Sequence, residues 1–409
     1  MSAPTQREPR DPLARKRARH LPPGTRSRAM HAMSARAAQG RFVLQVCTAC
    51  EAATYPPRDV CPACWGDLAW QDVAGGATVL CNTAIHASTD LYFREHLPWH
   101  MGKVQLDAGP VALVHLHRDL GPDDRAEVRL MLDRGGNAAL FALPLNTSQS
   151  TRGTEMTDPQ LREFVVPIAG RTVLVSDARS AIGHAVVKAL HDAGAGLILA
   201  GLPGPARAAD AADAVLSLPG VQPLPLEITD QTSVAEALSK VPGPLDIVIN
   251  TARHVRGGGV FHGGNAVEQR RALDVSVMGT MRLAQAVTPM LAGRPAGAFV
   301  DIVSSDALGG SASQAAFAAA EAARLSLVQT LRHEMRGIGV RVLSVFTGPV
   351  EDEHHQAVPP PRVAPDRLAA GIVDALLNGR EQTCVGDIAT DAMARWLADP
   401  ALFIREKNL

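Results

Sequence analysis

The stretch RTVLVSDARSAIGHAVVKALHDAGAGLILAG, residues 171–201, decides the fold of the longer part of this chain. An apolar run, a polar turn, a helical stretch and a second apolar run follow one another, which predicts strand, turn, helix and strand. Such a unit opens a doubly wound parallel sheet. Later runs at residues 244–252, 297–305 and 340–348 are rich in Val and Ile and predict further buried strands. We therefore expect an α/β domain over residues 163–409.

A second pattern follows the strand predicted at residues 297–305. This strand ends in Ser304 and Ser305, a helical stretch comes next, and the last strand runs into Thr347-Gly348-Pro349. The segment resembles the catalytic stretch of the short-chain dehydrogenase/reductases, a Rossmann-fold family that carries Tyr-x-x-x-Lys on this helix. The resemblance places Phe317 at the tyrosine position and Glu321 at the lysine position.

These two replacements remove the chemistry that the resemblance would imply. In the family the tyrosine exchanges the substrate proton, while the lysine lowers the pKa of the tyrosine and holds the cofactor ribose. Phenylalanine has no proton to exchange, and a glutamate reverses the sign of the supporting charge. The helix asparagine that relays protons in the family corresponds to a serine here. We therefore expect no catalytic residues, only vestigial positions at Ser305, Phe317, Glu321 and Ser276.

The cofactor turn of the family, Thr-Gly-x-x-x-Gly-Ile-Gly, is altered as well. Only its last glycine remains in the segment 176–183. The glycines let backbone amides approach a pyrophosphate at a helix N-terminus, whereas the Asp177 carboxylate opposes that charge and the Ala181 methyl crowds it. The Asn-Asn-Ala-Gly turn of the family has become residues 250–253, NTAR. We do not expect NAD(P) binding, and regard the cofactor positions as vestigial: Ser176, Asp177, Ala181, Gly183 and Asn250.

Two interpretations of this domain follow. In the first, the strands are retained while the site residues are not, so the domain serves through its shape, as a scaffold for a partner. In the second, the domain is an active NAD(P)-dependent oxidoreductase for a hydroxyacyl or ketoacyl substrate, with an unusual proton donor at Ser304, Ser305 or Asp306.

The N-terminal part carries a metal motif. Two Cys-x-x-Cys pairs, separated by ten residues, can present four thiolates to one tetrahedral ion. We therefore predict a structural zinc site, with no open position for catalysis, at Cys47, Cys50, Cys61 and Cys64. His96, His100, His115 and His117 could suggest a second ligand cluster, but we favour packing or surface roles for them.

Short alternating runs over residues 76–144 predict a small five-stranded barrel after the cysteine motif. Together with a helix from residue 30, residues 30–145 resemble the zinc-ribbon/OB-fold proteins associated with acyl-CoA metabolism. Glu51 departs from the glycine that often follows the first cysteine pair in that family. The resemblance implies a non-catalytic accessory subunit that packs on a thiolase-like or aldolase enzyme.

The remaining segments predict a tail and a linker around the two folded units. Residues 1–29 predict a basic disordered tail and residues 146–162 a flexible linker. No run is long enough to span a membrane, and we expect a cytoplasmic protein. Nucleic-acid binding by the barrel is not expected, because residues 66–145 carry ten Asp/Glu against six Arg/Lys.

The helix predicted at residues 313–335 is nearly all alanine in its first half. In the dehydrogenase family the corresponding helix pairs with its counterpart in a second subunit, and small residues let two backbones approach closely. We therefore expect a homodimer, or a heterodimer with an active dehydrogenase, through this helix. Alternatively, the alanines pack only against the sheet of their own subunit.

Overall fold

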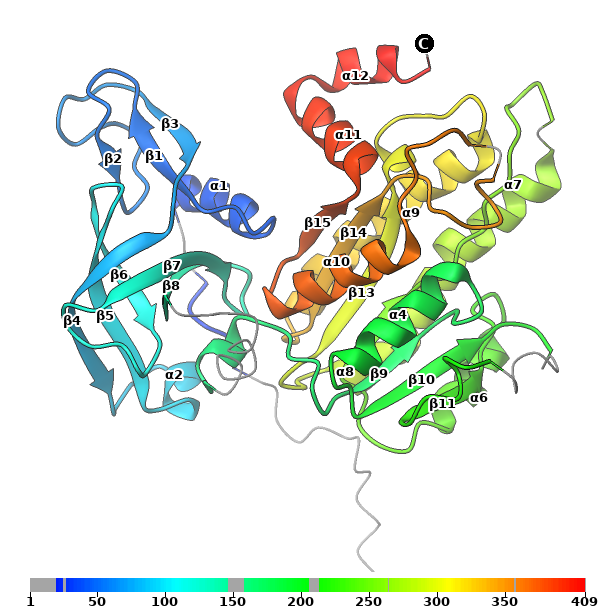
Figure 1. Cartoon of the computed structure of the whole chain (residues 1–409), viewed down its shortest axis with the longest axis horizontal. Coiled ribbons are helices and arrows are strands. Elements are labelled where there is room, and N and C mark those ends of the chain that lie inside the picture. Colours follow the sequence, from blue (N-terminus) through cyan, green and yellow to red (C-terminus); the bar gives the residue numbers. More distant parts are fainter. Residues whose placement is uncertain are drawn as a thin grey trace, which may run out of the picture.

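The computed structural model describes residues 20–24, 27–145, 158–205, 213–263, 265–356 and 358–408. Most of the predicted basic tail, residues 1–29, lies outside the described residues, as does the part of the predicted linker at 146–157. Figure 1 shows a β-rich N-terminal module beside a larger α/β domain. Within the described ranges, no helix has the length and apolar character needed to cross a membrane.

The N-terminal module begins with a helix and a small sheet. Helix α1 (Arg28–Ala37) is capped by Ser27, whose hydroxyl accepts a hydrogen bond from the Met30 amide at 3.3 Å. Strand β1 (Val43–Cys47) lies between β2 (Ala53–Thr54) and β3 (Leu68–Asp72), and both pairings are antiparallel. This sheet carries the two cysteine pairs.

The five-stranded barrel predicted from residues 76–144 is confirmed. Its strands are β4 (Gly76–Ile85), β5 (Trp99–Leu106), β6 (Val111–Leu116), β7 (Arg125–Leu132) and β8 (Ala138–Pro144). They close in the order β4-β5-β6-β8-β7, with a parallel contact only between β6 and β8. Side chains along β6 alternate between exposed and buried, as the two faces of a barrel strand require. A short helix α2 (Leu91–Glu95) precedes β5.

The described end of the predicted linker, residues 158–162, packs on the barrel. The Gln160 side chain accepts a hydrogen bond from the His100 amide and donates one to the His100 carbonyl, both at 2.8 Å. A 3₁₀ turn, η1 (Leu161–Glu163), follows, and Phe164 lies 5.2 Å from Phe141, ring centroid to centroid. The polar composition of the linker concealed this contact, because one amide side chain and two apolar residues suffice to make it.

The C-terminal domain is a doubly wound sheet of seven parallel strands in the order β11-β10-β9-β12-β13-β14-β15. This confirms the Rossmann-type fold expected from the sequence. The strands are β9 (Thr172–Val175), β10 (Leu197–Leu202), β11 (Val221–Pro225), β12 (Ile247–Asn250), β13 (Ala298–Ser304), β14 (Arg341–Thr347) and β15 (Gln382–Val385).

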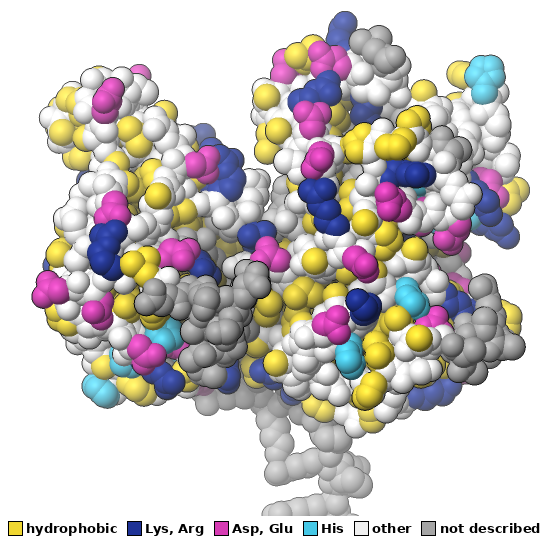
Figure 2. Space-filling model, viewed as in Figure 1, with side chains coloured by type: hydrophobic (Ala, Val, Ile, Leu, Met, Phe, Trp, Pro, Cys, Tyr) yellow, Lys and Arg dark blue, Asp and Glu magenta, His cyan; other side chains and the backbone are white. Residues whose placement is uncertain are grey.

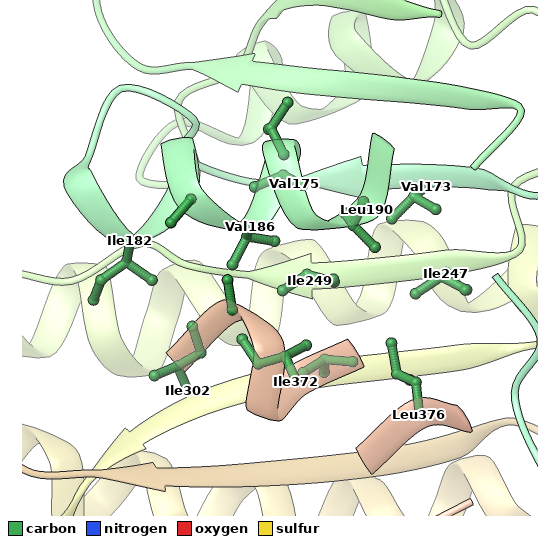
Figure 3. Packing of buried hydrophobic residues seen from close by; sticks show 14 of the residues in the cluster. Val173, Val175, Ile182, Val186, Leu190, Ile247, Ile249, Ile302, Ile372 and Leu376 are labelled. Carbon is green, nitrogen blue, oxygen red and sulfur yellow. The ribbon is translucent and has the colours of Figure 1, made fainter. Parts of the chain in front are cut away.

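Helices cover both faces of this sheet. Apolar residues of α4 (Ala181–Asp192) and α10 (Pro365–Leu377) pack on one face (Figure 3), where Val186 and Ile372 meet β-strand residues such as Ile249. The opposite face is covered by α6 (Gln231–Ser239), α8 (Thr280–Leu291) and α9 (Ala315–Arg336). The remaining elements are α7 (Ala266–Leu273), the π-helical turn η2 (Asp274–Gly279), the 3₁₀ turn η3 (Ser305–Leu308), α11 (Asp387–Ala398) and α12 (Pro400–Glu406).

The two units contact each other through buried backbone partners. The Arg341 guanidinium donates to the carbonyls of Leu132 and Phe164, each at 3.2 Å, and to that of Gly379 at 2.7 Å. The amides of Glu381 and Gln382, at the start of β15, both donate to the Ala38 carbonyl at 2.9 Å. The end of α1 is thereby joined to the edge of the seven-stranded sheet.

Candidate functional sites

The four predicted zinc ligands lie together. The sulfur atoms of Cys47, Cys50, Cys61 and Cys64 are all within 4.8 Å of one another. Cys47 Sγ is 3.4 Å from Cys64 Sγ, and Cys50 Sγ is 3.7 Å from Cys61 Sγ. A tetrahedral zinc ion with Zn–S bonds of ~2.3 Å separates its sulfur ligands by ~3.8 Å. The geometry therefore fits one structural zinc ion with all four positions filled by thiolates.

The backbone of each cysteine turn supports this role. The Ala49 amide points at Cys47 Sγ and the Ala63 amide at Cys61 Sγ, both at 3.4 Å. The amides of Cys50 and Ala49 lower the pKa of the Cys47 thiol to about 6, which favours the thiolate that a metal requires. The residue after each turn adopts a positive φ, 60° at Glu51 and 64° at Trp65. That conformation favours glycine, so Glu51 accepts a mild backbone cost at a position where glycine is usual.

The four histidines of the barrel do not form a common ligand cluster in the described ranges. The Trp99 indole N–H donates to His115 Nδ1 at 2.9 Å, and His96 Nδ1 lies 2.7 Å from the Tyr92 carbonyl oxygen. In the described ranges, no group of three or more His, Cys, Asp or Glu side chains other than the four cysteines is placed to hold an ion. Packing roles for these histidines agree with the interpretation favoured from the sequence.

The positions of the family's tyrosine and lysine both lie in the interior of the domain. Phe317 and Glu321, one turn apart on α9, are almost fully buried. The Glu321 carboxylate accepts a hydrogen bond from Ser276 Oγ at 3.0 Å and from the Ser304 amide at 2.8 Å. Glu321 therefore holds together the π-helical turn η2, the end of β13 and α9. The described contacts give it a structural role.

A buried ion pair next to Glu321 was not predicted from the sequence. The Arg324 guanidinium donates two parallel hydrogen bonds to the Asp301 carboxylate, at 2.7 and 2.6 Å, and both side chains are fully inaccessible. A further nitrogen of Arg324 is 3.5 Å from a Glu321 oxygen. An acidic residue in the middle of the buried run GAFVDIVSS was the available signal, because such a residue needs a cationic partner.

The charges in this network affect one another. Burial alone would lower the pKa of Arg324, but the carboxylates of Asp301 and Glu321 more than offset this and raise it above its ordinary value. Burial raises the pKa of Asp301, and Arg324 opposes that rise. Asn250 joins the network by donating to Asp301 Oδ1 and to Thr280 Oγ1, each at 2.9 Å. The network fills the interior between β12, β13 and α9.

The altered cofactor turn makes its own hydrogen bonds. The Asp177 carboxylate accepts from the amides of Arg179 at 3.0 Å and Ser180 at 3.2 Å. The Ser180 hydroxyl in turn accepts from the Gly183 amide at 3.1 Å, near the N-terminus of α4. These side chains engage amides of the turn that a pyrophosphate would otherwise use. Burial raises the pKa of Asp177, with the two amides acting in the opposite sense.

Local packing explains why glycine occupies position 183 and serine position 176. A Cβ at Gly183 would lie 1.7 Å from the Asp177 carbonyl oxygen, so only glycine fits this close approach of α4 to the turn. Ala181 is the first residue of α4 and is half-buried. Ser176 lies beneath the turn, where its hydroxyl donates to Asn250 Oδ1 at 2.8 Å. The five predicted cofactor positions are thus brought to one end of the sheet.

The alternative proton donors lie at the end of β13. Ser304 Oγ accepts from the Asp306 amide at 3.2 Å as the cap of η3, and Ser305 is buried. The Asp306 carboxylate accepts a hydrogen bond from the Lys407 ammonium at 2.7 Å, which fixes the C-terminal segment to this loop. Each of these groups already has a structural partner or is removed from solvent.

Two segments of the chain match known protein families. Residues 171–362 match the short chain dehydrogenase family, and residues 34–70 match the rubredoxin-like zinc ribbon domain of ChsH2. The resemblances that the sequence showed at both ends of the chain are confirmed by these matches.

Similar curated proteins align with about half of the chain. An uncharacterized oxidoreductase of Staphylococcus aureus (strain USA300) is 28% identical over 215 residues, which are 51% of this chain and 92% of that protein. A short chain dehydrogenase of Pseudocercospora fijiensis (strain CIRAD86) is 30% identical over 201 residues, 46% of this chain and 63% of that protein.

Solved structures resemble the same region. A short chain dehydrogenase from Burkholderia cenocepacia J2315 in complex with NADP is 27% identical, with a TM-score of 0.54 over 59% of this chain and 98% of that one. A short-chain dehydrogenase from Streptomyces avermitilis, 23% identical with a TM-score of 0.51 over 58% of this chain and 96% of that one, shares the fold. Because the first of these holds NADP, the prediction that this chain does without a nicotinamide cofactor is not confirmed.

Proposed function

Because this chain joins a zinc ribbon of the ChsH2 type to a short chain dehydrogenase domain, we propose that it is a non-catalytic accessory subunit of an acyl-CoA-processing complex. The observation that carries the proposal is the buried set Glu321, Arg324 and Asp301 beside Phe317, at the place of the family's tyrosine and lysine. These side chains hold the domain together, and none of them is an exchangeable phenol beside a free ammonium.

The cofactor end of the sheet supports the same proposal. Asp177 and Ser180 engage amides of the turn, and the Asp177 carboxylate would repel a pyrophosphate. The hollow beside them has a volume of about 180 Å³, below the range of roughly 300–1,000 Å³ usual for ligand pockets. Both features count against binding of a nicotinamide dinucleotide.

The N-terminal module supplies the proposed docking function. Four thiolates would hold zinc as a structural ion that keeps β1, β2 and β3 together. The resemblance to acyl-CoA-associated zinc-ribbon/OB-fold proteins suggests a thiolase-like or aldolase partner. The exposed face of α9 carries the small side chains of Ala319, Ala322 and Ala323, which would suit a second subunit. The dehydrogenase-like domain would then act as a scaffold that holds this second subunit next to the acyl-CoA enzyme.

The proposal is tested by cofactor binding, turnover and partner capture on the full chain. We expect no shift in thermal midpoint with NADH or NADPH, although tight binding at a hundredfold excess over Kd would stabilise the protein by about 2.7 kcal/mol. We also expect no oxidation or reduction of hydroxyacyl- or ketoacyl-CoA. Co-expression with thiolase-like and aldolase candidates from the same genome should give a stable complex. Steady turnover by the chain alone would contradict the proposal.

The second candidate function is an NADP-dependent oxidoreductase, and one observation favours it. Arg179 donates to the carbonyls of Pro203 and Pro205 just beyond the end of β10, where the residues Ala200, Gly201 and Leu202 include no carboxylate. An arginine at this place can contact a ribose 2′-phosphate. The solved relative in complex with NADP supports the same function. Saturable stabilisation by NADPH but not by NADH would favour this candidate.

Nucleic-acid binding, a third candidate, receives no support from the face of the molecule shown in Figure 2. On the face shown in Figure 2, basic and acidic side chains are interspersed over both units. On the barrel, Arg125 is paired with Asp107 at 2.6 Å and Arg129 with Glu127 at 3.0 Å. A phosphate backbone requires a continuous basic surface, and these two pairs place a carboxylate beside each arginine.

A further inference from the structure

Arg253 differs from the other buried arginines of this protein. It follows β12, at the last position of the turn 250–253, and all three of its guanidinium nitrogens are buried without a hydrogen-bond partner in the part of the chain that the structure describes. By contrast, Arg324 is paired with Asp301, and Arg341 donates to three carbonyls. The other arginines with an unsatisfied nitrogen in those ranges lack a partner only at Nε.

Nearby groups interact with the charge of Arg253 but make no hydrogen bonds to its guanidinium. Its guanidinium carbon lies 5.3 Å from the centroid of the Phe317 ring, so the ring at the family's tyrosine position covers one face of the cation. Burial lowers the pKa of Arg253, while Glu321, Asp352 and Asp306 act in the opposite sense and Arg324 adds to the lowering. A guanidinium remains charged in proteins. A buried cation without hydrogen bonds is costly, which calls for a compensating anion.

The carboxylates that act on Arg253 or line the same hollow are engaged by other groups; Asp306, for example, accepts a hydrogen bond from Lys407 at 2.7 Å. The Asp352 carboxylate is 2.7 Å from His355 Nδ1 and accepts from the amides of His354 and His355 at 3.0 Å. The Asp177 carboxylate accepts from its own turn. The Glu321 carboxylate is held by Ser276, Ser304 and Arg324. An anion that accepts hydrogen bonds from the Arg253 guanidinium would therefore have to be a bound ligand.

Arg253 lines the hollow of about 180 Å³ at the end of the sheet, between the altered cofactor turn and residues 352–354. The apolar side chains of Ile182, Pro203 and Val255 form part of its wall. The lining carries the carboxylates of Asp177, Asp352 and Glu353, the guanidinium groups of Arg179 and Arg253, and the His354 imidazole. Three carboxylates against two arginines disfavour a dianion, so the anion that pairs with Arg253 should carry a single negative charge.

We propose that this hollow binds a short-chain aliphatic monocarboxylate, with its carboxylate paired to the Arg253 guanidinium and its tail against Ile182, Pro203 and Val255. The Phe317 ring covers one face of the guanidinium, and its three nitrogens are buried in the unliganded structure, so a carboxylate would accept two parallel hydrogen bonds at the edge after a side-chain shift that opens the hollow to it. The small volume suits a molecule of a few carbon atoms. This site goes beyond the accessory role and does not depend on it.

The test uses the full chain, with sodium butyrate, sodium acetate and inorganic phosphate as probes at constant ionic strength. We expect a saturable rise in thermal midpoint of roughly 5 °C at a hundredfold excess of butyrate over its Kd. Acetate should bind more weakly because it lacks most of the apolar tail. Arg253→Met should abolish the butyrate effect, whereas Arg256→Met, at an exposed arginine three residues away, should retain it. Calorimetric titration should give one site per chain.

Thermal midpoints measured without ligand test whether the Arg253 charge destabilises the free protein. Without ligand, Arg253→Met should melt at or above the wild-type midpoint, because an unpaired buried charge has been removed. If Arg253→Met does not fold, Arg253→Lys tests the same point, since it keeps the charge but loses the fork, and its butyrate affinity should fall at least tenfold. Absence of a butyrate effect, an equal effect in Arg253→Met, or Arg253-dependent binding of phosphate instead of butyrate would each overturn the proposal. The NADPH experiment is unaffected by any of these results.

Discussion

Substituting Asp301 by asparagine tests whether the buried network stabilises the dehydrogenase-like domain. The Asp301 carboxylate receives two hydrogen bonds from Arg324, at 2.7 and 2.6 Å, and neither side chain is exposed. Asparagine preserves the size of the side chain and removes its charge. Its amide oxygen could accept one hydrogen bond from Arg324 in place of two, and the nearest remaining carboxylate would be that of Glu321, at 3.5 Å.

The expected magnitude follows from burial. Removing one partner of a buried ion pair costs about 3–5 kcal/mol, because the other charge stays buried and unpaired. Since Glu321 remains near Arg324, we expect a loss at the lower end, about 3 kcal/mol. For a domain of this size, each kcal/mol corresponds to ~2–4 °C in thermal midpoint. The midpoint of the C-terminal domain should therefore fall by roughly 6–12 °C.

Differential scanning calorimetry of the full chain is the assay, with hydrogen exchange of peptides from β13 and α9 to assign the affected transition. Asp107→Asn is the matched control. Asp107 also receives two hydrogen bonds from one arginine, Arg125, at 2.8 and 2.6 Å, but both side chains are about half exposed. Water can replace the partner there, so this variant should change neither transition noticeably.

A double variant that removes both charges of the pair is compared with Asp301→Asn, which removes one. Asp301→Leu combined with Arg324→Met replaces the pair by apolar side chains and should destabilise the domain less than Asp301→Asn alone. If Asp301→Asn melts like the Asp107→Asn control, the network does not stabilise the domain and the structural role assigned to Glu321 and Arg324 is wrong.

Three further predictions concern other parts of the molecule. Purified protein should contain about one zinc ion per chain by metal analysis, and Cys61→Ser should release it and unfold the β1–β3 sheet; a folded, metal-free ribbon would contradict the assignment. The chain should be a dimer by light scattering, and Ala322→Glu on the exposed face of α9 should make it monomeric, whereas an unchanged mass would exclude this face. Because burial raises the pKa of Asp177, its carboxylate costs stability at neutral pH, and that cost disappears as the pH falls through the raised pKa towards about 4. Asp177→Asn should remove this gain from pH-dependent melting curves, and an unaltered curve would show that Asp177 is not the group responsible.

The sequence alone determined which residue types of the dehydrogenase family are replaced and which metal is favoured. Phe317 and Glu321 stand where the resembling family has a tyrosine and a lysine, and the absence of a phenol can be seen from the residue type. The two Cys-x-x-Cys pairs predicted one tetrahedral site because ligand spacing along a short turn fixes where the sulfurs lie. The parallel sheet followed from apolar runs of strand length, and the barrel from alternation over residues 76–144.

Only the tertiary structure decided what the replaced side chains do. Asp301 and Arg324 are 23 residues apart in the chain, and their bidentate pair exists because β13 and α9 pack together. In the same way, Gln160 binds His100 across 60 residues and fixes the end of a segment whose composition indicated a free linker. The burial of the Arg253 guanidinium depends on where Phe317 comes to lie. Local patterns specify elements and short-range ligand sets, whereas pairings of buried charges depend on contacts between elements that no periodicity encodes.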